Sequence, residues 1–233
     1  PDHDLLAALS ELAGMVAKPG ATVARTVHAT TEPPAGALTP AAIGRSISLL
    51  MPENAIVVDE GATAGMAIYQ ETAGARRHDY LYSIPGGAIG GGLPLALGAA
   101  VACPGRKVVA LQADGSAMYT NQALWSLARE GCDVTVVLLK NDAYAVLDIE
   151  LARVREGDVT PKMHSLMDLA RPSIDWTRLA EGMGVSAVAV ADAAGFHEAF
   201  EQAMAQGGPR LIEASIEQDL QPGVDLIQQH RQA

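Results

Sequence analysis

The sequence is poor in the residues that mark several common classes of protein. Cysteine occurs only at Cys103 and Cys132, which is too little for a disulfide framework or a metal cluster. No uninterrupted run of apolar side chains reaches the roughly 18 residues of a membrane-spanning helix, so such a helix is excluded. Charged residues make up only 18% of the chain, which argues against a disordered protein.

Basic residues are also scarce, because 16 lysines and arginines face 27 aspartates and glutamates and leave a formal net charge of -11. The sequence has no basic cluster, so we expect neither a nucleic acid nor a membrane as a partner. A phosphate-bearing ligand would have to be held locally, by backbone amides or through a metal ion. The scarcity of cysteine makes a reduced, cytoplasmic protein the default expectation.

Apolar residues, by contrast, make up 49% of the chain, which is enough for the core of one α/β domain. Because the chain begins with Pro1 and not with methionine, we expect a fragment or one piece of a cleaved protein. Residues 4–16 have the leucine spacing of an amphipathic helix, and Pro33-Pro34 indicates a linker. We therefore divide the chain into the end of another domain (1–30), a linker (31–40), a main domain (41–220) and a tail (221–233).

The main domain alternates between short apolar runs and helical patterns. Buried strands are predicted at 55–59, 107–113, 134–139, 186–190 and 210–216. Helices are predicted at 63–72, 93–102, 121–130, 176–182 and 193–205, and the stretch from 142 to 172 is less regular. Strands that alternate with helices favour a parallel sheet with helices on both faces, and such sheets bind ligands at the carboxyl ends of their strands.

Polar residues follow two of these strands at that edge. Asp114 comes directly after one strand and Asn141 after the next, so each could offer a side-chain oxygen to Mg²⁺. The amides of Gly115 and Ser116, just before a helix, could meet a phosphate. Taken singly, Asp-Gly-Ser after a strand usually forms a turn, and the glycine run 86–92 is equally explained by close packing of a helix on the sheet.

Taken together, these segments indicate one kind of binding site more specifically than any of them does alone. Asp114-Gly115-Ser116 followed by Asn141 resembles the thiamine diphosphate motif, in which a GDG segment precedes an NN segment. The stretch GGAIGGGLPLALGAAVACPGRKVVALQADGSAMYTNQALWSLAREG is similar to the diphosphate-binding domain of the acetolactate synthase, benzoylformate decarboxylase and pyruvate decarboxylase superfamily. The resemblance covers roughly residues 40–220 and looks closest to acetolactate synthase-like large subunits. It implies a three-layer, mainly parallel six-stranded sheet and a decarboxylase or carboligase that uses thiamine diphosphate and Mg²⁺.

The resemblance also implies roles for single residues. Asp114, Asn141 and the carbonyl of Ala143 match the metal ligands of the family. The Gly87 carbonyl matches the acceptor of the cofactor's 4′-amino group, and Ile89 matches the apolar residue that props the cofactor into its bent shape. The positions that match the diphosphate-binding groups are Thr63, Gly115, Ser116, Ala145 and Val146.

Three positions depart from the pattern of the family. Ala113 replaces the first glycine of GDG, and Lys140 replaces the first asparagine of NN. Neither change removes a matched metal-ligand side chain. Leu147 stands where the pyruvate decarboxylases have a glutamate, so pyruvate decarboxylase chemistry is disfavoured.

The resemblance further implies that part of the enzyme is missing. The glutamate that activates the cofactor lies on an N-terminal pyrimidine-binding domain, and a middle domain follows it, so no catalytic residue is assigned to this chain. We expect both domains as partners, from the same or a separate chain, in a homodimer or homotetramer that acts on a 2-keto acid. Residues 1–30 resemble the last piece of the middle domain. FAD is left open, because its site would lie in that domain.

Two rival hypotheses remain. In a Rossmann dinucleotide-binding enzyme, the glycine run would hold the pyrophosphate and Asp114 the ribose. However, the run does not spell G-x-G-x-x-G, and the preceding YLYSIP makes a poor strand. The second rival is a degenerate, non-catalytic partner domain, against which the presence of both Asp114 and Asn141 argues.

Overall fold

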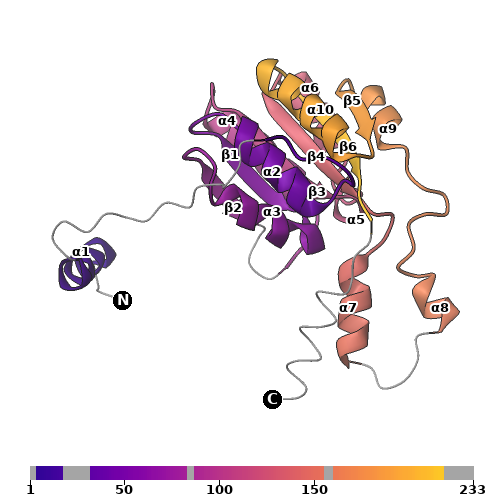
Figure 1. Cartoon of the computed structure of the whole chain (residues 1–233), viewed down its shortest axis with the longest axis horizontal. Helices are drawn as coiled ribbons and strands as arrows, with labels where there is room; N and C mark the ends of the chain where they lie inside the picture. The colour runs from indigo at the N-terminus through magenta and orange to yellow at the C-terminus, as the bar shows by residue number, and fades with distance from the viewer. Residues whose placement is uncertain (1–3, 18–31, 83–86, 155–159, 218–233) are drawn as a thin grey trace.

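The computed structural model describes residues 4–17, 32–82, 87–154 and 160–217 (Figure 1). Residues 18–30 of the predicted first segment, the first residue of the predicted linker and the whole predicted tail (221–233) therefore lie outside the described residues. Within the described part of the chain, no helix is long and apolar enough to cross a membrane.

The domain is built on one sheet of six parallel strands in the order β2-β1-β3-β4-β6-β5. This confirms the predicted mainly parallel, six-stranded α/β fold. Every residue of β1 pairs with β3 and every residue of β3 pairs with β4, so the ends of these three strands lie next to one another. The strand bounds are β1 Ile56–Glu60, β2 Asp79–Tyr82, β3 Val108–Ala113, β4 Val134–Lys140, β5 Ser186–Val190 and β6 Arg210–Ser215.

Helices cover both faces of the sheet. On one face α2 (Pro40–Leu50), α3 (Gly65–Thr72) and α10 (Ala193–Ala205) bury one apolar cluster against the strands. On the other face α4 (Gly92–Ala102), α6 (Ala123–Arg129) and α9 (Trp176–Gly182) bury a second cluster. Alternate residues of β3 enter the two clusters, which is why the central strands appear in the sequence as continuous apolar runs.

Side-chain caps fix where several of these helices begin. Asp175 accepts a hydrogen bond from the Arg178 amide at the start of α9, and Asp192 accepts one from the Gly195 amide at the start of α10. Both helices have the predicted bounds. Pro40, which the sequence analysis placed in the linker, is instead the first residue of α2, where its missing N–H costs nothing.

Two predictions of secondary structure are wrong. The YLYSIP segment was judged a poor strand, yet β2 begins at Asp79 and includes its first residues. The stretch from 142 to 172, expected to be less regular, contains the ten-residue helix α7 (Ala145–Val154) and the short α8 (Pro161–His164). Figure 1 shows α7 and α8 projecting from the end of the sheet, where they do not cover a face.

The N-terminal helix α1 (Leu5–Val16) is a helix, as predicted. Asp4 caps it by accepting hydrogen bonds from the amides of Leu6 and Ala7. None of its residues is buried. Its assignment to the end of a middle domain stays a prediction.

Candidate functional site

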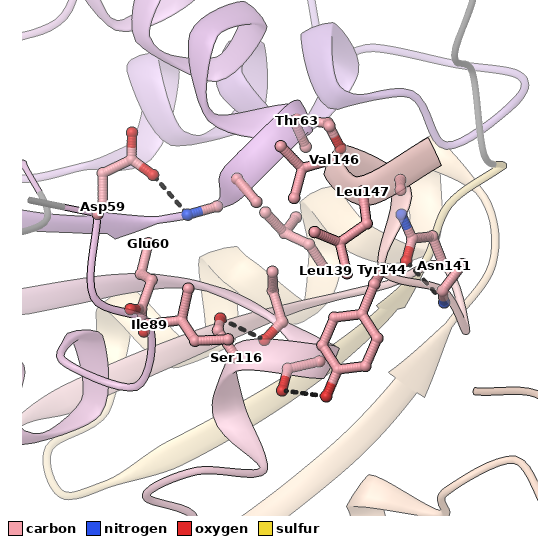
Figure 2. Close-up of a pocket in the computed structure, with 18 of the residues that line it drawn as sticks. Asp59, Glu60, Thr63, Ile89, Ser116, Leu139, Asn141, Tyr144, Val146 and Leu147 are labelled. Carbon is pink, nitrogen blue, oxygen red and sulfur yellow. Dashed lines mark hydrogen bonds between the residues drawn. The ribbon is translucent and has the colours of Figure 1, made fainter. Parts of the chain in front are cut away.

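A cavity of about 510 Å³ lies at the carboxyl edge of the sheet (Figure 2). The ends of β1, β3 and β4 form its floor, since Glu60 pairs with Gln112 and Ala113 pairs with Leu139 in the sheet. The short helix η1 (Ala62–Ala64) follows β1, α5 (Asp114–Ala117) follows β3, and the first turn of α7 follows β4. Three connections far apart in the sequence thus meet at one place, as expected for a parallel sheet.

Nine of the ten residues proposed from the sequence line this cavity. They come from η1, from the glycine run, from α5 and from the segment after β4, which includes the first turn of α7. The nine are Thr63, Gly87, Ile89, Gly115, Ser116, Asn141, Ala143, Ala145 and Val146. Asp114, the tenth, lies just behind the wall and is only 3% exposed.

The Asp114 carboxylate joins the ends of β3 and β4. One oxygen, Oδ2, accepts hydrogen bonds from the amides of Asn141 (3.2 Å) and Asp142 (2.8 Å), and Oδ1 accepts one from the Gly115 amide (2.9 Å). Burial raises the pKa of Asp114, although these amide hydrogen bonds oppose the rise. Burial disfavours the ionised form of this carboxylate, and a nearby cation would stabilise that form. The Asp114 carboxylate therefore suits a metal site.

The turn after β4 brings further oxygen atoms to the same place. Asp142 has a φ of 52°, in the left-handed region, and Asn141 Oδ1 accepts a hydrogen bond from the Ala143 amide (3.1 Å). Among the described residues, no group of three or more His, Cys, Asp or Glu could hold a metal ion. A set of one carboxylate, one amide oxygen and one carbonyl oxygen, which Asp114, Asn141 and Ala143 offer, is nevertheless suited to Mg²⁺ because Mg²⁺ prefers hard oxygen ligands and keeps further oxygens from water and phosphate.

The residues proposed to bind the diphosphate differ in whether their N–H and O–H groups are already hydrogen-bonded within the protein. The Gly115 amide was expected to be free, but it donates to Asp114 Oδ1. The Ser116 hydroxyl donates to the Ala113 carbonyl (3.1 Å) and accepts from Gln112 Nε2 (2.8 Å). The amides of Ala145 and Val146 begin α7, where an α-helix leaves its first N–H groups without partners inside the helix. These two amides and the Thr63 hydroxyl are therefore candidate donors for an anion.

Thr63 is far from Ala145 and Val146 in the sequence but lies near their amides in the structure. The helix η1 contacts α7, and Figure 2 shows Thr63 beside Val146. The cavity wall continues through Leu147 and Leu139 to Tyr144. One end of the cavity thus offers N–H and O–H donors, and the adjoining wall is apolar.

Tyr144 is a cavity residue that the sequence analysis did not single out. Its ring packs against the backbone of Gly115, where an added Cβ would lie 2.5 Å from Tyr144 Cε1. Its hydroxyl donates a long hydrogen bond to the Gly115 carbonyl (3.5 Å). Burial raises the pKa of the Tyr144 phenol, and Tyr119 and Asp114 add to the rise. Glycine is therefore required at 115 so that the ring can lie this close.

Glu60 is the second residue that the sequence analysis missed. Its carboxylate accepts hydrogen bonds from the consecutive amides of Gly90 (2.8 Å), Gly91 (3.1 Å) and Gly92 (2.9 Å). The amides of the glycine run are thus occupied by the protein's own carboxylate. This argues against the Rossmann hypothesis, in which the same amides would hold a pyrophosphate. An acidic residue at a strand end was the signal available in the sequence.

Lys140 does not enter the cavity. Its ammonium group donates to the Ile174 carbonyl (2.9 Å) and to Glu213 Oε1 (3.2 Å), on the side away from Asn141. Successive side chains of a strand point to opposite faces, so a lysine at 140 leaves the next residue free to face the cavity. The departure from the NN pattern is therefore accommodated without filling the site.

A family model described as "Thiamine pyrophosphate enzyme, C-terminal TPP binding domain" matches residues 79–214 of the chain. The match includes the glycine run, Asp114 and Asn141. It begins at the first residue of β2 and ends within β6.

Among curated proteins, a putative acetolactate synthase large subunit, IlvX, of Mycobacterium tuberculosis is 49% identical over 90% of this chain. The benzoylformate decarboxylase of Pseudomonas aeruginosa is 34% identical over 80% of it. The match covers 40% of the first relative and 35% of the second, so the chain spans well under half the length of either.

A solved structure gives the same picture. The thiamine diphosphate-dependent 4-hydroxybenzoylformate decarboxylase of Rhodococcus jostii RHA1 superposes with a TM-score of 0.72 and 31% identity. The superposition covers 92% of this chain and 40% of that one.

Proposed function

Because this chain belongs to the thiamine pyrophosphate enzymes and contains their C-terminal cofactor-binding domain, we propose that it is the diphosphate- and Mg²⁺-binding part of a 2-keto acid decarboxylase or carboligase of the acetolactate synthase-like type. The observation that carries the proposal is the meeting of nine candidate residues in one cavity, directly in front of Asp114.

In this proposal Asp114, Asn141 and the Ala143 carbonyl hold Mg²⁺, which neutralises the diphosphate against an acidic chain. The amides of Ala145 and Val146 and the Thr63 hydroxyl donate to the diphosphate oxygens. Ser116 and Gly115 shape the floor beneath it. Gly115 contributes by having no side chain, because its amide is already donated to Asp114.

The other end of the cofactor would meet the glycine run. The Gly87 carbonyl would accept a hydrogen bond from the 4′-amino group, and Ile89, which is 47% exposed at the cavity wall, would support the bend between the two rings. When bound, thiamine diphosphate supplies the electron sink for decarboxylation of a 2-keto acid. The chain's own apolar wall, which includes Val146 and Leu147, would exclude water from that chemistry.

The remainder of the enzyme is proposed to come from elsewhere. The chain spans about 40% of the length of IlvX, which leaves room there for the pyrimidine-binding and middle domains. The first of these would supply the activating glutamate at an interface, in a homodimer or homotetramer. The presence of both Asp114 and Asn141 at the cavity supports a catalytic assembly over a degenerate partner domain.

Reconstitution tests the proposed function. Residues 1–233 alone should bind thiamine diphosphate weakly and decarboxylate no 2-keto acid, because the pyrimidine end of the cofactor would lack its partner. Joined to the N-terminal domains, the chain should retain both thiamine diphosphate and Mg²⁺ through gel filtration and turn over at least one 2-keto acid in a substrate screen. An active monomer of these 233 residues would refute the proposed division of the site.

The contact between Gly115 and Tyr144 gives a local test. Gly115→Ala should weaken thiamine diphosphate binding about 10-fold, since the new Cβ would displace the Tyr144 ring into the cavity. In a Tyr144→Ala background the same substitution should cost much less, because the ring is gone. Isothermal titration of the four variants measures this coupling, and equal costs in both backgrounds would rule the clash out.

A further inference from the structure

Glu60, the last residue of β1, is an acidic side chain to which the proposed cofactor contacts give no role. Glu60 is only 6% exposed, yet no lysine, arginine or histidine is hydrogen-bonded to its carboxylate in the described structure. Instead, Oε1 accepts from the amides of Gly90 and Gly91, and Oε2 accepts from the Gly92 amide and from Gln112 Nε2 (2.8 Å). Four donors fill the roughly four acceptor sites of a carboxylate, so little capacity is left for a ligand.

The glycine run is shaped to receive this carboxylate. Gly92 begins α4, and a negative charge at that place is favoured by the unpaired amides of the helix start. A Cβ on Gly92 would lie 2.4 Å from Gln112 Oε1 and 2.9 Å from Glu60 Oε2. Gly90 has a φ of 95°, which is strained for residues with a side chain. Only glycine at both positions lets three consecutive amides face one carboxylate.

A second contact holds the same run from the other side. Thr120 Oγ1 donates to the Gly90 carbonyl (2.7 Å), while Glu60 binds the Gly90 amide. The peptide units beside Gly90 are therefore fixed on both sides. Ile89 precedes Gly90 directly, and Figure 2 shows Glu60 next to Ile89.

We propose that Glu60 is a positioning residue that holds segment 87–92 so that the Gly87 carbonyl and Ile89 meet the aminopyrimidine end of thiamine diphosphate. This inference rests on the proposed function. Glu60 acts through the loop and not on the cofactor, because its acceptor sites are already filled. The diphosphate end depends on other elements, namely η1, α5 and the start of α7.

This division predicts that the two ends of the cofactor respond differently to the loss of Glu60. Gln112 Nε2 also donates to Ser116 Oγ (2.8 Å) and lies 3.4 Å from the Ala113 carbonyl. When Glu60 is replaced, Gln112 keeps these two acceptors and the floor of the diphosphate end stays in place. The glycine run, by contrast, loses its only charged acceptor among the hydrogen bonds of the described residues.

The test compares two ligands in the complete assembly, each with Mg²⁺. Glu60→Gln keeps the size of the side chain but turns an NH₂ group toward amide donors, so at least one of them loses its acceptor. We expect the Kd for thiamine diphosphate to rise about 10-fold or more, as the loop is misplaced. The Kd for inorganic diphosphate, which lacks the pyrimidine, should change less than about 2-fold, because its donors are not touched.

Two matched variants exclude a merely structural effect. Lys107 lies at the opposite edge of the sheet and donates to Asp133 Oδ1 (2.6 Å) and to the Ala203 and Gln206 carbonyls, so Lys107→Met destabilises the fold without touching the cavity. It should leave the ratio of the two dissociation constants unchanged. Thr63→Val should weaken both ligands together, because Thr63 is proposed to donate to the diphosphate itself.

Hydrogen exchange gives a readout that needs no ligand. In the cofactor-free assembly, the amides of Gly90 to Gly92 should exchange faster in Glu60→Gln than in Lys107→Met. Equal exchange in the two variants, or an equal loss of both ligands in Glu60→Gln, would overturn the positioning role alone. A wild-type assembly that binds no thiamine diphosphate would overturn the proposed function and this inference with it.

Discussion

Replacing Asp114 with alanine is expected to abolish the Mg²⁺-dependent retention of thiamine diphosphate. The change removes the one carboxylate of the proposed ligand set. Losing a group that merely supports a metal ligand costs up to about 100-fold in affinity, so losing the ligand itself should lower cofactor affinity by at least about 100-fold. Equilibrium dialysis with and without Mg²⁺ measures the loss. Asn141→Ala should act in the same direction but more weakly, because it removes a neutral ligand.

Asp59 provides a matched control for this experiment. It is another buried aspartate at the same edge of the sheet, and it accepts hydrogen bonds from the Gly61 amide (2.7 Å) and the Tyr80 hydroxyl (2.8 Å). Burial raises the pKa of Asp59 as it does that of Asp114. Asp59→Asn should keep the Mg²⁺ dependence of cofactor binding. If Asp114→Ala retained the cofactor normally, the metal assignment would be wrong.

The second large effect is expected at Lys140. Its ammonium group and Glu213 form an ion pair whose side chains are 13% and 9% exposed, and Glu213 Oε2 also accepts from the Trp176 amide at the start of α9 (3.0 Å). Lys140→Met should lower the free energy of unfolding by about 3–5 kcal/mol, because it leaves a buried carboxylate without its counter-charge. Urea unfolding of the chain measures the change.

The double variant Lys140→Met/Glu213→Gln should recover part of this loss, since a neutral amide can still accept from the Trp176 amide. The exposed pair of Arg178 and Asp175 serves as the comparison, because its arginine is 85% exposed. Removing the Arg178 charge should produce no clear change in the unfolding midpoint. An equally small effect at Lys140 would mean that the buried pair does not hold α9 to the sheet.

The parts of the fold that could be predicted are those whose signals are local in the sequence. The central strands β3, β4 and β6 are buried on both faces and therefore appear as apolar runs. Caps at Asp175 and Asp192 mark the starts of α9 and α10.

The two missed elements lack such signals. The strand β2 lies at the edge of the sheet, and its residues are mostly exposed. Its sequence therefore has no continuous apolar run from which a buried strand could be predicted. The helix α7 projects from the sheet, and several of its apolar side chains, including Val146 and Leu147, are exposed. Among the described side chains of α7 only Ala145 is buried, so the helical period of its apolar residues is weak in the sequence.

The residues of the candidate site also divide into those with a local signal in the sequence and those without one. Asp114 and Asn141 each follow a strong strand, so their meeting at one edge follows from a parallel sheet. Glu60 also stands at a strand end, but its role and that of Tyr144 could not be predicted in this way, because their partners lie about 30 residues away in the chain, at Gly90 and Gly115. Their roles depend on how loops pack after the sheet has formed, which no local pattern encodes.

The most direct measurement is a crystal structure of the complete assembly grown with thiamine diphosphate and Mn²⁺ in place of Mg²⁺. Anomalous scattering should place one metal ion about 2.1 Å from an Asp114 oxygen, Asn141 Oδ1 and the Ala143 carbonyl, with the diphosphate beside Thr63 and the first turn of α7. A metal ion bound elsewhere, or a diphosphate on the amides of Gly90 to Gly92 in place of Glu60, would contradict the account.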